Sequence, residues 1–249
     1  MKDHNSLEAV LLESQSRGYL GDQPVARQIE HSLGFADVCT AATPLMEGQL
    51  FSSTSDPARG VIQLLDLGAG GGIPGLVLAL SGVLSSVERF RLLEGSSRRG
   101  EWLSRAVEIL GLASYVDVVC ERAELAGRDP ALRSSVSIVV ARSFGRPAVT
   151  AECAAPFLDV GGLLVVSEPP STAGLQEDQS GGLIPGARRI GHSVELESRW
   201  PREGLRALGY GPTCEWRARG FRYAVSQLQL SCRDRFPRRN GIPAKRPLF

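Results

Sequence analysis

The sequence predicts an α/β fold with a mostly parallel sheet covered by helices on both faces. From residue 61 onward, short apolar segments alternate with segments of helical periodicity, which is typical of parallel strands buried on both faces. A cluster of glycines separates the first apolar segment from the helix that follows it. Near the C-terminus, two apolar segments flank Arg219-Gly220 and predict an antiparallel hairpin. Five parallel strands and this hairpin give a seven-stranded sheet.

Residues 1–58 are predicted to form a short helical N-terminal extension. Leu7, Val10 and Leu11 recur at helical spacing, and Arg17 to Gly21 interrupts the pattern. A second helix is expected to begin near Pro24, because proline is favoured in the first turn. Residues 44–59 are rich in Ser, Gly and Pro and predict a linker.

The sheet-forming part of the chain is predicted element by element. Five strands are expected at residues 61–65, 90–93, 116–119, 136–140 and 163–166. The helices between and after them are expected at residues 73–80, 102–110, 149–158 and 202–208. Residues 168–190 are rich in Gly and Pro and predict a long mobile loop or lid. The terminal hairpin is expected at residues 213–218 and 221–230.

Composition excludes several classes of protein. The 249 residues are 43% apolar and 22% charged, which is ordinary for a folded chain. No apolar run approaches the roughly 18–20 residues of a membrane helix, and the N-terminus does not resemble a signal peptide. A cytoplasmic location without membrane association is therefore expected. The five cysteines form no CxxC pair and the three histidines lack metal-ligand spacing, so we predict neither a disulfide scaffold nor a metal site.

The net charge of +1 conceals an asymmetry along the chain. Residues 1–187 carry 14 basic and 22 acidic side chains, whereas residues 188–249 carry 14 basic and 5 acidic ones. A basic segment on an acidic body is typical of a polyanionic partner such as nucleic acid. A solvated arginine-rich surface is the alternative.

The glycine cluster predicts a nucleotide-like ligand. It runs from Gly68 to Gly75 between a strand and a helix, where bare backbone can approach a ligand closely. Asp66 precedes it, and Glu94 ends the second strand, where a carboxylate can accept hydrogen bonds from both ribose hydroxyls. No Gly-Lys-Ser/Thr follows, which excludes a Walker A loop. NAD(P) and S-adenosyl-L-methionine remain, as does a simple tight turn.

The acidic pattern favours S-adenosyl-L-methionine over NAD(P). Asp66, directly before the loop, suits the sulfonium and α-amino charges, and Gly70 would lie beside the methionine moiety. No Tyr-x-x-x-Lys pair typical of an oxidoreductase is evident, and the chain has only two lysines. A hairpin added to a five-stranded α/β core is also the arrangement of class I (Rossmann-like) methyltransferases, an argument by analogy.

The extension Ile73-Pro74-Gly75 makes the loop more distinctive than its glycines alone. Residues 64–76 resemble the hallmark loop of the bacterial small-subunit (16S) rRNA guanine-N7 methyltransferase family, the RsmG/GidB type. Other segments resemble the same family at residues 92–99, 121–124, 140–144 and 235–248. The resemblance implies an S-adenosyl-L-methionine-dependent enzyme of rRNA processing that methylates N7 of a guanine. Together with the patterns along the chain, this predicts a helical N-terminal extension at residues 1–58, a methyltransferase domain at 59–232 and a basic C-terminal tail at 233–249.

The resemblance also implies site residues. Gly68 and Ile73 would line the cofactor, and Ala123 and Glu124 would flank its adenine. Arg142 would lie where cofactor and target meet, as both a cofactor-binding and a catalytic residue. The alternatives are a surface ion pair for Arg142, a helix-start carboxylate for Glu124 and a solvated strand end for Glu94.

One segment departs from the family pattern. Many members carry an Arg-His-Ile-x-Asp-Ser helix, whose counterpart here is Gln28-Ile29-Glu30-His31-Ser32-Leu33, and we find no Asn-Leu-Thr segment. The implied partner is small-subunit rRNA or a ribosomal particle, bound by a monomer. Two other functions remain open: a methyltransferase of another RNA atom or a small molecule, and a non-catalytic RNA-binding relative.

The basic tail carries six basic residues and one acid. Three prolines disfavour a continuous helix, so the tail is expected to be poorly ordered alone and to lie along rRNA phosphates when bound. Alternatively, it packs on the sheet as a strap anchored by Phe236 and Phe249.

Overall fold

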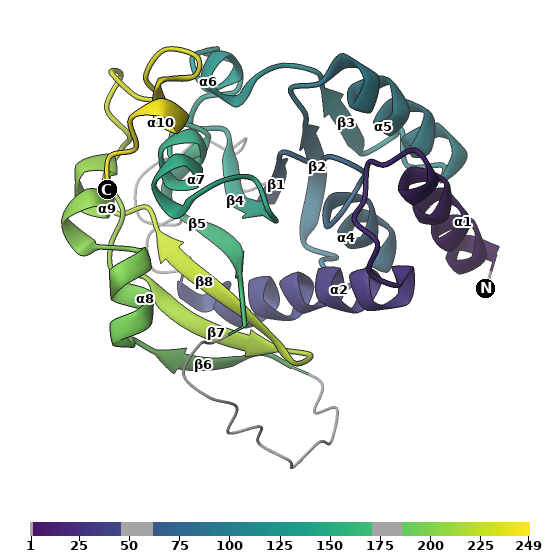
Figure 1. Cartoon of the computed structure of the whole chain (residues 1–249), viewed down its shortest axis with the longest axis horizontal. Helices are drawn as coiled ribbons and strands as arrows, with labels where there is room; N and C mark the ends of the chain where they lie inside the picture. The colour runs from purple at the N-terminus through teal and green to yellow at the C-terminus, as the bar shows by residue number, and fades with distance from the viewer. Residues whose placement is uncertain (1, 46–61, 171–185) are drawn as a thin grey trace.

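A single twisted sheet organises the chain (Figure 1). The computed structural model describes residues 2–45, 62–170 and 186–249. Within them the sheet has eight strands in the order β3-β2-β1-β4-β5-β8-β7-β6. The first five in that order are parallel, and β8, β7 and β6 continue the sheet antiparallel. The predicted fold class is therefore confirmed.

All eight strands except the one at residues 188–191 overlap segments that were predicted to be strands. The strands are β1 (Ile62–Leu67), β2 (Val87–Leu93), β3 (Val116–Val119), β4 (Val136–Ala141), β5 (Leu158–Glu168), β6 (Arg188–Gly191), β7 (Cys214–Ala218) and β8 (Phe221–Gln227). Leu64 of β1 pairs with Phe90 of β2 and with Ile138 of β4, which fixes the register at the centre of the sheet. Every residue of β4 is buried, because helices cover both of its faces.

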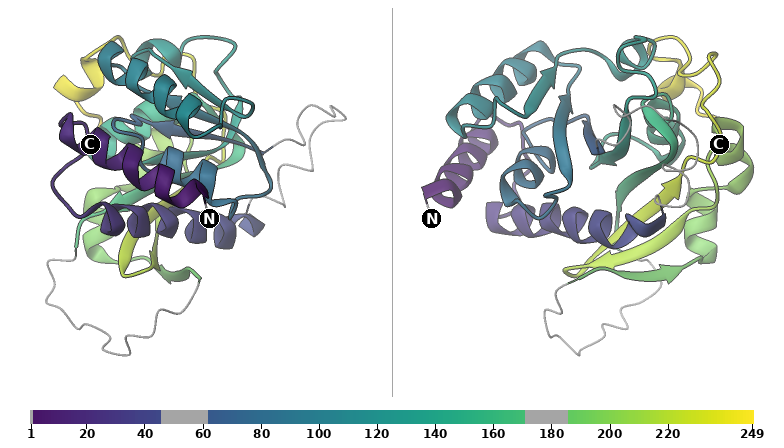
Figure 2. Two further views of the ribbon diagram at one scale, coloured as in Figure 1. Left: turned by 90° about the vertical axis from the view of Figure 1, so that its right-hand side faces the viewer. Right: turned by 180° about the vertical axis from the view of Figure 1, so that it is seen from behind.

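Helices form a layer on each face of the sheet (Figure 2). One layer consists of α1 (Lys2–Ser16), α2 (Val25–Ala42), α4 (Gly75–Ser81) and α5 (Ser97–Ile109). The other consists of α6 (Ala123–Ala126), α7 (Pro147–Ala154), α8 (Val194–Arg199), α9 (Arg202–Leu208) and α10 (Ile242–Lys245). Each layer encloses its own apolar cluster against the sheet.

The predicted N-terminal extension is a pair of helices that belongs to the core. Leu7, Leu11 and Phe35 are buried in the cluster beneath the first helical layer. The end of α1 lies against the glycine loop, because Ser14 Oγ donates a hydrogen bond of 2.8 Å to the carbonyl of Gly71. Leu20, in the turn after α1, also packs there, since a Cβ added to Gly71 would lie 2.5 Å from its Cδ2. The first helical layer thus reaches the carboxyl ends of the parallel strands.

The sheet has one strand more than predicted. β6 pairs antiparallel with β7 at the sheet edge, within residues expected to form a loop. The rest of that expected loop, residues 171–185, and most of the expected linker lie outside the described residues. The short helices α6, α8 and α10 were also not predicted, because segments of four to six residues are too short to show helical periodicity.

The C-terminal tail is folded, which differs from the expectation of an extended, poorly ordered segment. Phe236 is buried, and Phe249 packs against the same apolar cluster. Arg238 forms an ion pair of 2.6 Å with Glu152 of α7, whose side chain is fully buried. The strap interpretation therefore describes the tail. The three-part division of the chain stays a prediction.

Candidate active-site cleft

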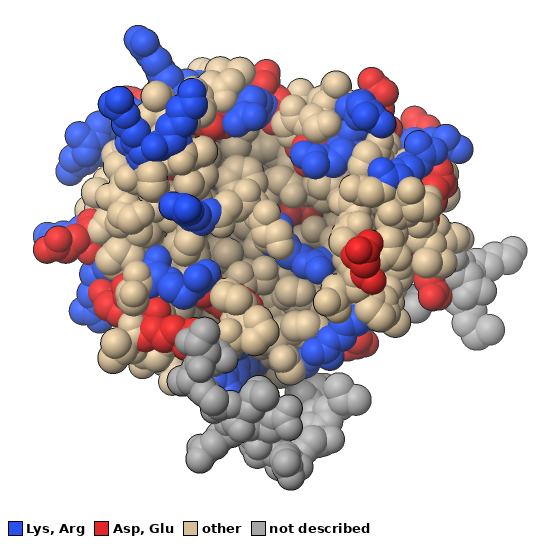
Figure 3. Space-filling view, viewed as in Figure 1, with Lys and Arg blue, Asp and Glu red and all other residues tan. Residues whose placement is uncertain are grey.

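A cleft of about 640 Å³ opens at the carboxyl ends of the parallel strands. The face seen in Figure 3 is hollowed at its centre. The cleft is lined by the glycine loop after β1, the ends of β2, β3 and β4, the α1–α2 turn and the C-terminal tail. In open α/β sheets this edge is where ligands bind.

The glycine loop owes its shape to backbone conformations that disfavour side chains. Gly68, Gly70 and Gly72 all have positive φ, at 76°, 54° and 106°. The amides of Gly68 and Ala69 both donate to the carbonyl of Leu93, so the loop is tied to the end of β2. The loop therefore presents bare backbone to the cleft in a fixed form.

Asp66 lies beneath the loop rather than in the cleft. Its side chain is fully buried, and Oδ2 accepts a hydrogen bond of 2.8 Å from the Gly75 amide. Oδ1 is buried with no hydrogen-bond partner among the described residues. Burial raises the pKa of Asp66 to about 7, and the nearby Glu94 charge adds to this, while the Gly75 hydrogen bond and Arg142 oppose it. The structure thus gives Asp66 a role in holding the loop, unlike the predicted contact with the cofactor.

Glu94 lines the cleft where β2 ends. Its Oε2 accepts from the Gly70 amide at 2.9 Å, and its Oε1 accepts from the Ser96 amide at 2.8 Å. Arg99 of α5 pairs with Oε1 at 2.7 Å. The carboxylate is only 3% exposed. Oε2 keeps a second lone pair that can accept a ligand hydroxyl, whereas both lone pairs of Oε1 already accept from Ser96 and Arg99.

Ala123 and Glu124 line the other end of the cleft, at the start of α6. Glu124 Oε1 accepts from the Gly241 amide at 3.0 Å, which connects this wall to the C-terminal tail. Burial acts to raise the pKa of Glu124, but hydrogen bonds from Gly241 and Arg122 outweigh it, and the pKa lies below its usual value. The side chain is therefore a carboxylate at neutral pH.

Arg142 follows β4 and lines the cleft between the two helical layers. One hydrogen bond joins it to another described residue, from Nη1 to Gln28 Oε1 at 3.3 Å. Burial lowers the pKa of Arg142, and Tyr223 and Asp66 act in the opposite direction. A guanidinium has five N–H donors, so this half-buried group retains donors for a ligand.

Most predicted site residues meet in this cleft, and others were missed. Gly68, Gly70, Ile73, Glu94, Ala123, Glu124 and Arg142 all line it. The residues that the sequence did not single out include Tyr19, Leu20, Gly21, Gln28, Phe144 and Ala244. Tyr19 to Gly21 form the interruption between the first two helices, and such a break was the one available signal. Nothing local to Ala244 marks it as a cleft residue.

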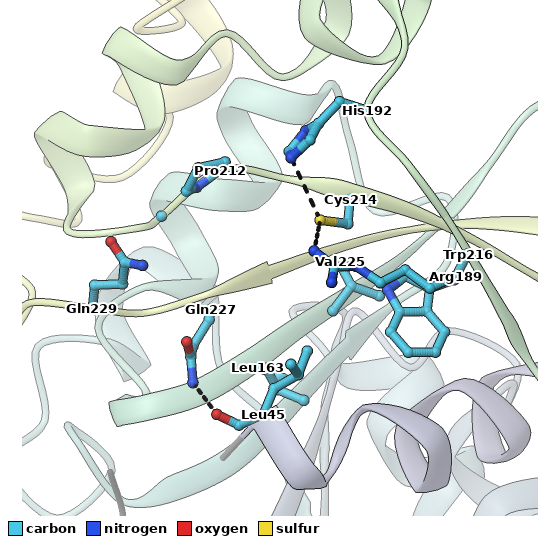
Figure 4. A pocket seen from close by; sticks show the side chains of 11 residues that line it. Leu45, Leu163, Arg189, His192, Pro212, Cys214, Trp216, Val225, Gln227 and Gln229 are labelled. Atoms are coloured by element: carbon cyan, nitrogen blue, oxygen red, sulfur yellow. Dashed lines mark hydrogen bonds between the residues drawn. The ribbon is translucent and has the colours of Figure 1, made fainter. Parts of the chain in front are cut away.

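A second, smaller cavity of about 180 Å³ lies on the antiparallel part of the sheet (Figure 4). Cys214 Sγ lies between Arg189, at 3.0 Å from Nη2, and His192, at 3.8 Å from Nε2. Among the described residues, no group of three or more His, Cys, Asp or Glu side chains is placed to hold a metal ion. No described helix is long and apolar enough to cross a membrane.

The cleft suits an adenosine-bearing sulfonium compound. A buried carboxylate at the end of β2 matches a ribose diol, and the bare loop backbone permits close approach. The carboxylates of Glu94 and Glu124 line the cleft, each paired with an arginine that also lines it, and Arg142 adds a donor to acceptor groups. The residues present therefore fit S-adenosyl-L-methionine.

Comparison with known proteins assigns the family. The model of the rRNA small subunit methyltransferase G (GidB) family matches residues 48–170. Ribosomal RNA small subunit methyltransferase G of Rubrobacter xylanophilus is 34% identical over 209 residues, which cover 83% of this chain and 74% of the relative. The chain belongs to this family. The Deinococcus deserti member is 33% identical over 75% of this chain and 68% of its own length.

Solved structures agree on the fold. The O-methyltransferase from Bacillus cereus in complex with SAH aligns with a TM-score of 0.53 at 13% identity, over 90% of each chain. The cofactor-bound Rv0187 from MTB aligns with a TM-score of 0.52 at 17% identity, also over 90% of each chain. Both alignments extend across the sheet and helical layers, so this family member has a methyltransferase fold.

Proposed function

We propose that this chain transfers the methyl group of S-adenosyl-L-methionine to N7 of a guanine in small-subunit rRNA. The observation that carries the proposal is the cleft in a member of this family, where the glycine loop, Glu94 and Arg142 meet. Glu94 would accept the ribose hydroxyls, the glycine loop would face the methionine moiety, and Ala123 and Glu124 would flank the adenine. Asp66 supports the loop from below through Gly75.

The reaction needs positioning more than proton transfer. The bound cofactor supplies an electrophilic methyl group on a sulfonium. N7 of guanine carries a free lone pair, so attack requires no prior deprotonation and no general base. The protein must align the base, exclude water and tolerate positive charge developing on the purine.

Arg142 is placed to orient the base. Arginine commonly reads the O6 and N7 edge of guanine. A donor to N7 would block the nucleophile, whereas a donor to O6 leaves it free. The spare N–H groups of Arg142 fit the second role, and Gln28 Oε1 holds one side of the guanidinium. The target base must leave its stack to reach the cleft.

The folded tail offers the RNA a basic surface beside the cleft. Its exposed side chains include Arg239, Lys245 and Arg246, and none of these side chains has a hydrogen bond or ion pair among the described residues. Blue side chains gather at the upper left of Figure 3, over the tail. Phosphates of rRNA would bind there. A cytoplasmic location and a monomeric state accompany this proposal.

The experiment is methyl transfer to purified small-subunit rRNA and small-subunit particles, followed by mass mapping of the modified nucleosides. The expected product is 7-methylguanosine at one position. Label found only in other nucleosides, or only in metabolites, would contradict the proposal. Calorimetric titration with S-adenosyl-L-methionine tests the cofactor separately, and sedimentation tests the monomer.

A further inference from the structure

Two aromatic side chains face the cleft from opposite helical layers. Among the described residues that line it, Tyr19 and Phe144 are the aromatic ones. Tyr19 packs at the edge of the apolar cluster formed with α1, α2, α4 and α5, whereas Phe144 packs against the cluster on the other face. The lining of the cleft therefore includes one aromatic residue from each side of the sheet.

The ring of Phe144 is already used by the glycine loop. A Cβ added to Gly68 would lie 2.6 Å from Cδ2 of Phe144, so this ring rests directly on the loop. Tyr19 has a different setting. Its side chain is half-buried, and it comes from the turn between α1 and α2.

The turn that carries Tyr19 is held firmly in place. The side-chain amides of Gln15 and Gln28 both donate to the same two carbonyls, those of Gly21 and Gln23, at 2.6–3.0 Å. The Tyr19 amide donates to the carbonyl of Ser14 at 3.0 Å, and Ser14 Oγ reaches the glycine loop. Such a network fixes a turn before any ligand arrives, which reduces the ordering cost of binding.

Gln28 also places this turn beside Arg142. Its Nε2 holds the turn, while its Oε1 accepts from Arg142 Nη1. The turn that carries Tyr19 is therefore connected to Arg142 through the side chain of Gln28. The adenine wall of Glu124 is built by different segments, α6 and the tail.

We propose that Tyr19 is the stacking residue for the target guanine, in a turn held in place by Gln15 and Gln28. This inference rests on the proposed function. Stacking uses the π-face of the base and leaves the N7 lone pair free to attack, which a hydrogen bond to N7 would not. Single-stranded bases that leave a helix are commonly held on aromatic side chains in this way.

The test compares Tyr19→Ala, Tyr19→Leu and Tyr19→Phe with the unaltered protein. For Ala and Leu, kcat/KM for small-subunit RNA should fall by about 5- to 150-fold, the range of base–aromatic stacking. The Kd for S-adenosyl-L-methionine should stay within about threefold of the unaltered value, because Tyr19 is proposed to contact the guanine and not the cofactor. Phe should retain the activity, because it keeps the ring. Leu keeps apolar contact with the core, so it guards against simple misfolding of the Ala variant.

Leu12→Ala serves as the control, because Leu12 lies on α1, the helix that precedes the turn with Tyr19, is 50% exposed and does not line the cleft. Three results would overturn the proposal: unchanged RNA kinetics in the Ala and Leu variants, an equal loss in the Phe variant, or a loss confined to cofactor affinity, which would place the cofactor's adenine on Tyr19. If the unaltered protein does not methylate small-subunit RNA, the proposed function is refuted instead. The stacking is then tested by comparing the RNA affinity of the Tyr19 variants with that of the unaltered protein, with S-adenosylhomocysteine bound.

Discussion

Two buried acids near the glycine loop have different chemistry because of their partners. Glu94 has two backbone amides and an arginine around its carboxylate, and it lines the cleft. Asp66 has one backbone amide, no described partner for its second oxygen and no access to the cleft. Glu94 is therefore suited to bind a ligand, whereas Asp66 supports the loop.

Glu94→Ala should weaken S-adenosyl-L-methionine binding. The change removes the proposed acceptor for the ribose hydroxyls. It also breaks the hydrogen bond from the Gly70 amide that ties the glycine loop to Glu94. Charge-assisted hydrogen bonds contribute about 1.5–3 kcal/mol, so Kd should rise by about 10- to 100-fold. Calorimetry with S-adenosylhomocysteine measures this. The control is Glu88→Ala, which removes an exposed acid of the same strand and should leave Kd unchanged. If the Glu94 variant binds with the Kd of the unaltered protein, Glu94 does not contact the cofactor.

Asp66→Asn should change how stability depends on pH. The pKa of Asp66 is about 7 in the folded protein and near 3.8 when unfolded, so the fold favours the protonated form. The stability that this preference supplies is present below about pH 4 and is lost as pH rises through about 7. The melting temperature of the Asn variant relative to the unaltered protein should therefore increase from pH 5 to pH 8. A constant difference would contradict the shifted pKa.

His31 explains why this test needs a variant rather than the unaltered protein alone. Burial, with Arg142 and Arg27 nearby, lowers the pKa of His31 to about 4. Its stabilising neutral form is present above about pH 6.5 and is lost as pH falls toward 4. Between about pH 4 and 7, rising pH therefore removes the stability that Asp66 supplies and restores the stability that His31 supplies. The two effects offset each other in the unaltered protein.

The site residues that follow the ends of apolar strands could be predicted from the sequence. Glu94 and the loop glycines stand directly after apolar strands, so their convergence follows from parallel topology. Gln28 and Ala244 reach the cleft from the two terminal regions, and only tertiary packing brings them there. The burial of Asp66 was missed because a carboxylate next to a glycine loop has the same sequence pattern whether it faces the ligand or the core.

Among the elements, the parallel strands were predictable because both of their faces are buried. Continuous apolarity placed β3 at its observed residues, and β1 and β4 within two residues. β6 is exposed along three of its four residues, so it has no apolar signature. The tail was misjudged because its prolines and charges resemble those of a disordered segment, whereas Glu152 and the apolar cluster provide partners for it.

Arg238→Ala should destabilise the protein. It leaves the Glu152 carboxylate, which is fully buried, without its guanidinium partner. Breaking a buried pair costs about 3–5 kcal/mol. The melting temperature should fall clearly, whereas Arg239→Ala, its exposed neighbour, should leave it unchanged. If both variants melt like the unaltered protein, the tail is not held by this ion pair.

At the scale of the whole molecule, the basic side chains proposed to bind RNA can be removed without changing the stability of the fold. The combined change of Arg239, Lys245 and Arg246 to Ser should reduce the slope of log affinity for rRNA against log salt, by about 0.7 per lost contact on single strands. The melting temperature should not move, because these side chains have no partners among the described residues. The control is Arg89→Ser, which removes a basic residue of β2 that is paired with Asp117 of β3, and it should leave the salt slope unchanged. An unaltered slope in the triple variant would place the RNA elsewhere.

The walls of the cleft come from segments that are far apart along the chain. Ser14 and Gln28 lie near its beginning, and Gly241 and Ala244 lie more than 210 residues later. A ribosome that synthesises this protein therefore releases the glycine loop well before the tail segment that contacts Glu124 and completes that side of the cleft. During translation the nascent chain can fold its parallel strands while the cleft is still open on one side, so full cofactor affinity should arise only after residue 244 has left the exit tunnel.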